Sequence, residues 1–471
     1  MLARVLKYLC FFLIIFGIFV GPWPVDNTHY SQTQYAKKSF AEIKTLTPDH
    51  RESLLSAGTA KAEIVPAIDA PLAGYSARKP KTHNGAQHKI YAKALTLSNS
   101  HQTITVLNAE ILLPLEKLIN AVLINTKLKR HEVYFTSTHT HSGLGGYANG
   151  LIEEASLGSF SQSQFDNIVK ACSAAILESR NNLQPAKIRY RRLNLSRDVA
   201  NEFIYNQLDE NSTGHRTIHT LEVLKTEKSQ TESEHRISSL ITFSAHPTYL
   251  GRLNHAISGD YPHPLMKTLE ENLGGTVLFA SGAVGGMLPP TIGRENEKNV
   301  ANQTRQLNLL GKRLGRIITE HLNKTLSVKN EADMDVNWST DSTSIDSMIN
   351  TLHLPYPNYL INQDLRLSPF LVNAIFHGNK SYIHTLRIGK LFLLAYPADY
   401  SGELADQLEQ WGNSQDIFAW SISFNGEYLG YLMPSKLYSL DHYTTRDVNF
   451  YGRWTGDYFH HSSKQIIQAL R

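Results

Sequence analysis

Apolar residues along the chain follow two patterns. Short continuous runs rich in Val, Ile, Leu and Phe, such as Thr276–Gly286 and Lys390–Asp399, predict buried β-strands. Longer segments with apolar residues every three or four positions, such as Ser161–Arg180 and Asn302–Leu322, predict amphipathic helices. Further strands are expected at Lys89–Ser98, Gln102–Leu113, Glu132–His141, Arg236–Pro247 and Ile417–Phe424, and further helices at Pro114–Lys129 and Ser401–Trp411. Because the two kinds of segment alternate, the sequence predicts the α/β class, with mixed β-sheets flanked by helices in a single large domain.

The N-terminus has a different pattern. Arg4 and Lys7 precede the apolar run Tyr8–Val20, and the Gly-Pro-Trp-Pro sequence after it ends any helix. No small-x-small cleavage site follows the run. We therefore expect residues 1–25 to form an N-terminal hydrophobic membrane anchor, with a cleaved signal segment as the alternative. Basic residues before an apolar segment place the rest of the chain outside the cytoplasm.

Two further regions follow this N-terminal segment. Residues 26–56 are polar and are expected to form a lead-in or stalk, with a helix from Ser39 to Ala57. Residues 57–471 carry the alternating strand and helix patterns, contain no low-complexity linker and are expected to form the catalytic domain.

Composition narrows the classes of function. The chain is 41% hydrophobic and 19% charged, as in globular proteins, and its net charge of +4 is spread along the sequence. We therefore expect no nucleic-acid partner. The only cysteines are Cys10 and Cys172, which excludes a disulfide framework and a cysteine-rich zinc site. Any metal ion must then be held by His, Asp, Glu or Tyr side chains.

Polar side chains stand where several of the expected strands end. They are His139, His141, His246 and Asp399, with Tyr428 and Tyr431 in the segment after the strand Ile417–Phe424. Ligands bind at the carboxyl ends of strands in α/β sheets, and imidazole and carboxylate groups are zinc ligands. The set therefore predicts a zinc site. The alternative is that these residues are structural: Asp399 would then cap the helix near Ser401, and Tyr431 would be a core residue.

One of these strand ends resembles a known signature. The sequence "THTHSGLGGY" at Thr138–Tyr147 is similar to the "THTHSGPGGY" signature of neutral/alkaline, non-lysosomal ceramidases. Segments resembling other parts of that family follow in the same order, from "AGTAKAEIVPAIDAPLAGY" at Ala57–Tyr75 through "FSAHPTYLGRLNHAISGDYP", "LFASGAVGGMLPP", "YPADYSGELADQL" and "NGEYLGYLMPS". The resemblance extends from Ala57 to Thr455 and concerns the N-terminal catalytic domain of the family. No C-terminal immunoglobulin-like domain is expected.

The resemblance implies roles for individual residues. The family's zinc ligands correspond to His139, His246, Asp399 and Tyr431, with aspartate here in place of the family's glutamate. Three further residues correspond to substrate-contacting positions and are expected to be catalytic: His141, Arg197 and Tyr451. His141 and Arg197 would bind the substrate carbonyl.

The function implied is that of a zinc-dependent hydrolase. It would cleave the N-acyl amide bond of a ceramide-like lipid with metal-activated water, at a membrane reached through the N-terminal segment. The catalytic domain would be periplasmic or extracellular, in a membrane-anchored or secreted protein. Leu288 stands in place of the family's serine, and Gly286 in place of its aspartate. Two alternatives therefore stay open: a zinc hydrolase of another N-acyl amide or ester, and a catalytically inactive lipid-binding relative.

Overall fold

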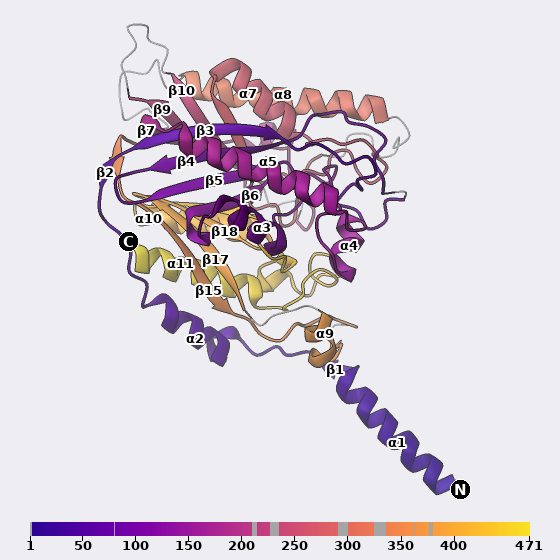
Figure 1. Cartoon of the computed structure of the whole chain (residues 1–471). Coiled ribbons are helices and arrows are strands. Elements are labelled where there is room, and N and C mark those ends of the chain that lie inside the picture. The colour runs from indigo at the N-terminus through magenta and orange to yellow at the C-terminus, as the bar shows by residue number, and fades with distance from the viewer. Residues whose placement is uncertain are drawn as a thin grey trace.

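The structure, a computed structural model, describes residues 2–79, 81–209, 214–226, 235–290, 300–324, 336–362, 364–375 and 380–471. Within these residues, two β-sheets lie face to face, and helices cover the outer face of each sheet (Figure 1). The architecture is therefore four layers, helix on sheet on sheet on helix. This confirms the predicted α/β class with mixed sheets flanked by helices.

Among the described residues, the larger sheet contains nine strands, most of them from the first half of the chain. They are β3 (Ser56–Glu63), β4 (Tyr91–Ser98), β5 (Thr103–Ala109), β6 (Val133–Ser137), β7 (Gln184–Asn194), β9 (Thr217–Lys225), β10 (Arg236–Phe243), β11 (Thr276–Ser281) and β13 (Val336–Thr340). Among the described residues the spatial order is β11-β10-β9-β7-β3-β4-β5-β6, with β13 paired to β7. The pairs β5–β6 and β10–β11 are parallel, and the other pairs are antiparallel.

The smaller sheet and several short strand pairs come mostly from the second half of the chain. The smaller sheet consists of β15 (Ile345–His353), β17 (Lys380–Ile388), β18 (Leu391–Tyr396) and β20 (Phe418–Ser423), in that order, and only β18–β20 is parallel among these pairs. The short pairs are β1 (Trp23–Pro24) with β16 (Leu365–Arg366), β2 (Ser53–Leu54) with β14 (Ser342–Thr343), β8 (Tyr205–Asn206) with β12 (Met287–Leu288), and β19 (Asp399–Tyr400) with β21 (Tyr431–Leu432).

Helices pack on the outer face of each sheet through their apolar sides. On the larger sheet these are α3 (Glu116–Thr126), α5 (Gln162–Asn181) and α7 (Pro262–Leu273), with α8 (Val300–Lys324) packed on α7. On the smaller sheet they are α2 (Gln34–Ile43), α10 (Gly402–Ser414) and α11 (Thr455–Leu470). The remaining helices are α1 (Leu2–Phe19), α4 (Leu151–Leu157), α6 (Arg197–Ala200) and α9 (Pro369–Ile375).

The space between the two sheets is the main apolar core. Leu95 and Val106 of the larger sheet and Leu393 of the smaller sheet belong to one buried cluster there, as does Trp420 of β20. The Trp420 Nε1 group also donates a hydrogen bond of 2.5 Å to Thr242 Oγ1 of β10, which connects the two sheets. Burial of this shared core fixes the relative position of the loops at the strand ends.

Most of the predicted elements are present, but one helix is not. The helix expected from Ser39 to Ala57 is wrong: α2 begins earlier and ends at Ile43, and the chain beyond Pro48 forms β2 and β3. Proline lacks the backbone N–H that a continuing helix needs, and the segment pairs with strands instead. Ala36 and Ile43 of α2 are buried beneath the smaller sheet, so α2 is part of the folded body.

The N-terminal segment forms a helix that projects from the body (Figure 1). Among the residues that the structure describes, no helix is long and apolar enough to cross a membrane. The membrane anchor expected at residues 1–25 is therefore not supported; Arg4 and Lys7 lie within α1 and confine its apolar run to Tyr8–Phe19. Met1 lies outside the described residues. The last turn of α1 is tied to the body, because Ser368 donates hydrogen bonds to the carbonyl oxygens of Ile18 and Val20 at 2.7 and 3.0 Å.

Candidate metal centre

His139 and His141 lie in the turn after β6, and the local structure fixes the orientation of the His139 ring. Its backbone is in the left-handed region, with a φ of 56°, which is uncommon for a residue other than glycine. His139 Nδ1 lies 2.9 Å from the carbonyl oxygen of Leu112, and the ring stacks on Phe424 with 3.6 Å between centroids. A ring whose Nδ1–H donates to a carbonyl presents the lone pair of Nε2.

His246 follows β10 and is held from behind in a similar way. Its backbone N–H donates to the carbonyl oxygen of Met287 at 3.1 Å, and its side chain hydrogen-bonds the backbone of Val284. Both partners belong to the loop after β11. The parallel pair β10–β11 therefore brings this loop behind the His246 ring.

The Nε2 atoms of the three histidines form a nearly equilateral triangle. His139 Nε2 lies 3.0 Å from His246 Nε2 and 3.1 Å from His141 Nε2, and the remaining side is 3.0 Å. A neutral ring whose Nδ1 carries the proton has only a lone pair at Nε2, so such atoms cannot satisfy one another. An ion at the Zn–N distance of ~2.0–2.1 Å can reach all three, so the residues present fit a metal.

The environment keeps these imidazoles neutral. Burial lowers the pKa of His246 to about 4, and burial together with the neighbouring histidines lowers the pKa of His139 well below its usual range. The pKa of His141 is lowered in the same way, with a contribution from the charge of Arg78. The neutral ring is the form that binds a metal.

Asp399 joins the cluster from β19. Its Oδ1 atom lies 4.0 Å from His139 Nε2 and 3.8 Å from His246 Nδ1, while Tyr428 donates to Oδ2 at 2.6 Å. Oδ1 is buried and has no hydrogen-bond partner in the part of the chain that the structure describes. Burial raises the pKa of Asp399 to about 7, and the Tyr428 hydrogen bond acts against that rise. Helix α10 is capped by Ser401, so Asp399 does not have the capping role considered as the alternative.

Tyr431 reaches this region through strand pairing. It is the register partner of Asp399 in the parallel pair β19–β21, and its side chain is buried. Its hydroxyl hydrogen-bonds Tyr443, whose ring lies edge-on at 5.7 Å between centroids. Tyr443 was not predicted from the sequence. No spacing pattern indicates it, because the fold of a loop beyond β21 brings it here.

His141 is the partly exposed member of the triangle, and its backbone rests on the Gly74-Tyr75 turn. Gly74 has a φ of 105°, and a Cβ there would lie 2.6 Å from the Cα of His141, so only glycine permits this approach. Arg78 is buried and donates to the His141 carbonyl oxygen at 2.8 Å and to that of Ala73 at 2.6 Å. Arg78, also absent from the predicted set, therefore positions the turn that carries His141. The Nε2–Nε2 distances are nearly the same for His141 as for His139 and His246, the two histidines expected to be zinc ligands.

The other two predicted catalytic residues are not brought into the triangle. Arg197 begins the short helix α6 with an exposed side chain, whereas His139 and His246 are buried. Tyr451 is buried in an apolar cluster that packs against Tyr428, whose hydroxyl donates to Asp399. Burial and the charge of Glu427 raise its pKa to about 12.

The loop in which Leu288 replaces the family's serine holds the centre together through its backbone. Leu288 is half-buried in β12, opposite Tyr205 of β8. Earlier in the loop, the Gly285 N–H donates to the Tyr400 carbonyl oxygen at 2.8 Å, and a Cβ on Gly285 would lie 2.7 Å from the Asp399 carbonyl oxygen. The segment after β11 thus links His246 to Asp399 without a serine hydroxyl.

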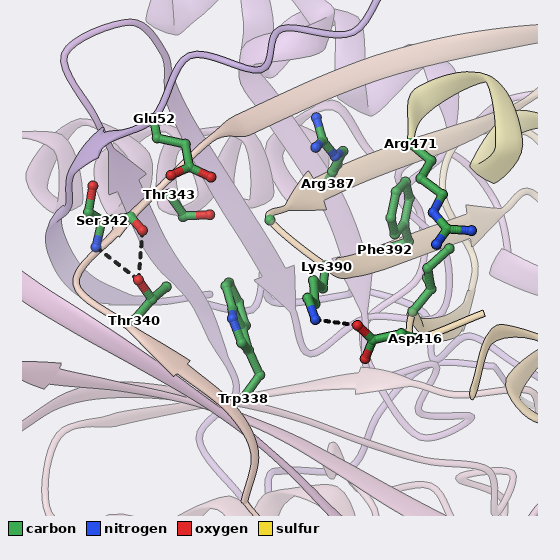
Figure 2. A pocket seen from close by; sticks show the side chains of 12 residues that line it. Glu52, Trp338, Thr340, Ser342, Thr343, Arg387, Lys390, Phe392, Asp416 and Arg471 are labelled. Atoms are coloured by element: carbon green, nitrogen blue, oxygen red, sulfur yellow. Dashed lines mark hydrogen bonds and ion pairs between the residues drawn. The ribbon is translucent and has the colours of Figure 1, made fainter. Parts of the chain in front are cut away.

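A separate pocket of about 380 Å³ lies elsewhere in the molecule (Figure 2). Trp338, Arg387 and Lys390 line it, and Lys390 pairs with Asp416 at its edge. None of the histidines of the triangle, nor Asp399 or Tyr431, lines this pocket. The candidate metal centre is therefore a different site.

Comparison with known proteins identifies the family of the segment that carries the histidines. Residues 56–288 match the family model of the neutral/alkaline non-lysosomal ceramidase, N-terminal. This segment belongs to that family. The neutral ceramidase of Oryza sativa subsp. japonica is 24% identical over 217 residues, which cover 44% of this chain and 27% of the relative. The neutral ceramidase of Pseudomonas aeruginosa is 28% identical over 142 residues, which cover 28% of this chain and 21% of the relative. The alignments thus span well under half of either relative.

Solved ceramidase structures share the fold over a longer stretch. The crystal structure of neutral ceramidase from Pseudomonas aeruginosa superposes with a TM-score of 0.68 at 18% identity, covering 90% of this chain and 74% of that one. A ceramidase complexed with C2 gives a TM-score of 0.67 at 17% identity, covering 90% and 75%. The ceramidase family segment includes the three histidines but ends before Asp399 and Tyr431. These two residues are linked to the site by the geometry described above.

Proposed function

We propose that this protein is a zinc-dependent hydrolase that cleaves the N-acyl amide bond of a ceramide-like lipid. The observation that carries the proposal is the triangle of His139, His141 and His246 Nε2 atoms, with sides of 3.0–3.1 Å. Beside it lies Asp399 Oδ1, which has no hydrogen-bond partner among the described residues. This donor set suits zinc and lies at the ends of strands, and its three histidines belong to a ceramidase-family segment.

Zinc, when bound, would supply a Lewis acid for the amide carbonyl and a water of lowered pKa at neutral pH. His139 and His246 would hold the ion through rings fixed by the carbonyl oxygen of Leu112 and the backbone of Val284. Asp399 would direct Oδ1 toward the same point, because Tyr428 occupies its other oxygen.

His141 is proposed to serve the substrate: with its proton on Nε2 it would be a hydrogen-bond donor beside the ion, which His139, His246 and Asp399 would hold. It is the partly exposed histidine, and its ring lies 5.0 Å from that of Tyr75, so a ligand entering the centre would meet this side first. A donor placed beside the carbonyl oxygen of the scissile amide would stabilise the negative charge that develops there. Arg197 would contribute from its exposed position on α6, and Tyr451 would act through its packing against Tyr428.

The substrate class follows from what the matched relatives are called. Both curated relatives are neutral ceramidases, and one of the matched structures is a ceramidase complexed with C2. We therefore propose a ceramide-like lipid with an N-acyl amide bond as substrate. The test is a panel of N-acyl amides with sphingoid, amino-acid and simple alkyl head groups, together with esters of the same acyl chains. Hydrolysis of the sphingoid amides ahead of the others is expected, and preference for another head group or for esters would contradict the ceramide assignment.

Leu288 favours a second candidate function, a catalytically inactive lipid-binding relative. The residue places an apolar side chain in β12, where the family has a serine. We rank this second because the histidine triangle and Asp399 are intact and because hydrolysis by an activated water requires no serine nucleophile. Wild-type protein that binds zinc but hydrolyses nothing in the panel would establish the second candidate.

The location of the catalytic domain is proposed from the sequence. Basic residues ahead of the apolar run Tyr8–Phe19 suit a domain that is periplasmic or extracellular, in a secreted or membrane-anchored protein. Such a location gives access to a lipid substrate in a bilayer. Protease accessibility of the domain in intact cells or spheroplasts checks this proposal, and full protection by the cytoplasmic membrane would contradict it.

A further inference from the structure

A second cluster of metal-binding side chains lies outside the candidate metal centre. His215, His219 and Glu409 each offer one atom, and these atoms lie within 4.8 Å of one another. Glu409 Oε2 is 2.9 Å from His215 Nε2 and 3.5 Å from His219 Nε2. All three side chains are buried, with exposed fractions of 2%, 0% and 6% in the order named.

The surroundings orient all three side chains toward one point. His215 Nδ1 lies 2.9 Å from Ser244 Oγ, and His219 Nδ1 lies 2.7 Å from the hydroxyl of Tyr190. Both rings are therefore held by Nδ1 and present Nε2 to the carboxylate. A fixed Nδ1 contact and an inward Nε2 are typical of metal-binding histidines.

Hydrogen bonds within the cluster leave one buried atom with only a long contact. Arg192 donates a hydrogen bond to Glu409 Oε1 at 3.0 Å, and His215 Nε2 hydrogen-bonds Oε2. His219 Nε2 is fully buried and lies 3.5 Å from the same oxygen, so its contact with Glu409 is long. An ion between the three donors would give His219 Nε2 a full-strength partner.

Two other histidine–carboxylate pairs in the described chain lack this arrangement. His353 Nε2 lies 3.0 Å from Glu42 Oε1, and His263 Nδ1 lies 2.9 Å from Glu110 Oε2. Each of these pairs has a single histidine on the carboxylate. Among the described residues, only the candidate metal centre and the cluster at Glu409 bring three such donors together.

We infer that His215, His219 and Glu409 form a second metal site, which takes zinc or a divalent ion of similar preference through two imidazole nitrogens and one carboxylate oxygen. The ion would join two layers of the fold, because His219 lies in β9 of the larger sheet and Glu409 in α10 on the smaller sheet. The ring of Trp420 lies 5.3 Å from that of His219 and closes the site on one side.

The site also supports the candidate metal centre mechanically. Ser244, which contacts His215, precedes His246 by two residues and accepts a hydrogen bond from the N–H of Ala283 at 3.1 Å. Ala283 lies in the loop that links His246 to Asp399. A metal at His215 would therefore fix the Ser244 hydroxyl beneath that loop, and its role is structural.

The test is the zinc content of tag-free, full-length protein after dialysis with zinc, measured by mass spectrometry of the metal. We expect about two ions per chain in the wild type, about one in His246→Ala, about one in Glu409→Gln and none in the double variant. His353→Gln, which changes a histidine paired with a single glutamate, is the matched control and should keep both ions. Circular dichroism of each variant checks that it is folded.

Zinc-edge X-ray absorption of the His246→Ala protein tests the inference without changing the second cluster. Two imidazoles and a carboxylate oxygen around the remaining ion are expected. A wild type that holds one ion, lost in His246→Ala and kept in Glu409→Gln, would overturn the second site and leave the proposed function standing. A wild type that holds one ion, lost in Glu409→Gln and kept in His246→Ala, would support the second site and contradict the proposed function.

Discussion

The two histidine clusters of this protein differ in how tightly the fold closes around them. In the candidate metal centre, His139 and His141 are in a turn with a left-handed backbone at His139, His141 is partly exposed, and Asp399 Oδ1 is unpartnered among the described residues. In the cluster at Glu409, all three donors are buried, and Arg192 holds the outer carboxylate oxygen. An accessible side is what a catalytic centre needs, whereas full enclosure suits a structural ion.

The largest effect is expected for His246→Ala. Loss of one corner of the triangle leaves two rings and removes the metal, so amide hydrolysis should fall by well over ~100-fold, more than the loss of a supporting contact costs. Steady-state kinetics and zinc content measure this effect. His353→Gln should retain wild-type activity, and a His246→Ala protein with near-normal turnover would remove the distinction between the two clusters.

Asp399→Asn is expected to have the next largest effect. The amide keeps the shape of the side chain but loses the negative charge facing His139 and His246, so zinc affinity should fall by ~10–100-fold. Asp399→Glu, which installs the residue type expected from the family, should keep most of the affinity. Competition with a chromogenic chelator measures both variants. Equal affinity in Asp399→Asn and the wild type would show that Oδ1 is not a ligand.

Glu409→Gln should affect stability more than chemistry. Removing one charge from a buried cluster that includes Arg192 costs about 3–5 kcal/mol, so Tm should fall by several degrees while KM changes little. Differential scanning fluorimetry with and without added zinc measures the shift. A Glu409→Gln protein that has lost hydrolysis but kept the Tm of the wild type would reverse the roles assigned to the two clusters.

Leu288→Ser is expected to have a smaller effect. The loop holds His246 and Asp399 through backbone groups of Met287 and Gly285, so a hydroxyl at position 288 is not needed for the centre to form. Turnover of the best amide substrate should change only a few-fold in either direction. Activity that appears only in Leu288→Ser would show that the family's serine is essential and that the wild type is an inactive relative.

Deleting Met1–Trp23 should have the smallest effect on either cluster. The segment contacts the body through Ser368 and through the short pair β1–β16, away from both sets of donors. The shortened protein is expected to fold and to keep its zinc content. Loss of zinc from a folded protein of this length would show that the N-terminal segment supports the centre.

The sequence predicts the first cluster much better than the second. His139, His246 and Asp399 stand at ends of apolar runs, and parallel pairing of β5–β6, β10–β11 and β18–β20 brings those ends together. Strand-end position is therefore a usable signal. His215 and His219 lie before and within a strand, and Glu409 lies in a helix far along the chain, so only the packing of the two sheets makes them neighbours.

The supporting residues were missed for the same reason. Arg78 acts through backbone carbonyl oxygens of the His141 turn, Phe424 through stacking on His139, and Tyr443 through Tyr431. None of these contacts has a fixed sequence spacing. Arg197 illustrates the opposite case, since a loose local similarity indicated a residue whose side chain the fold leaves exposed.

The central claim is that the histidine triangle beside Asp399 makes this protein a metal-dependent N-acyl amide hydrolase. The most direct measurement is hydrolysis of a short-chain ceramide by the wild type after removal of metal with a chelator, and again as zinc is titrated back. Activity should be lost on depletion and recovered in proportion to the zinc bound, with His246→Ala staying inactive at every zinc concentration. Full activity in the metal-free protein, or no hydrolysis by the zinc-loaded protein, would contradict the claim.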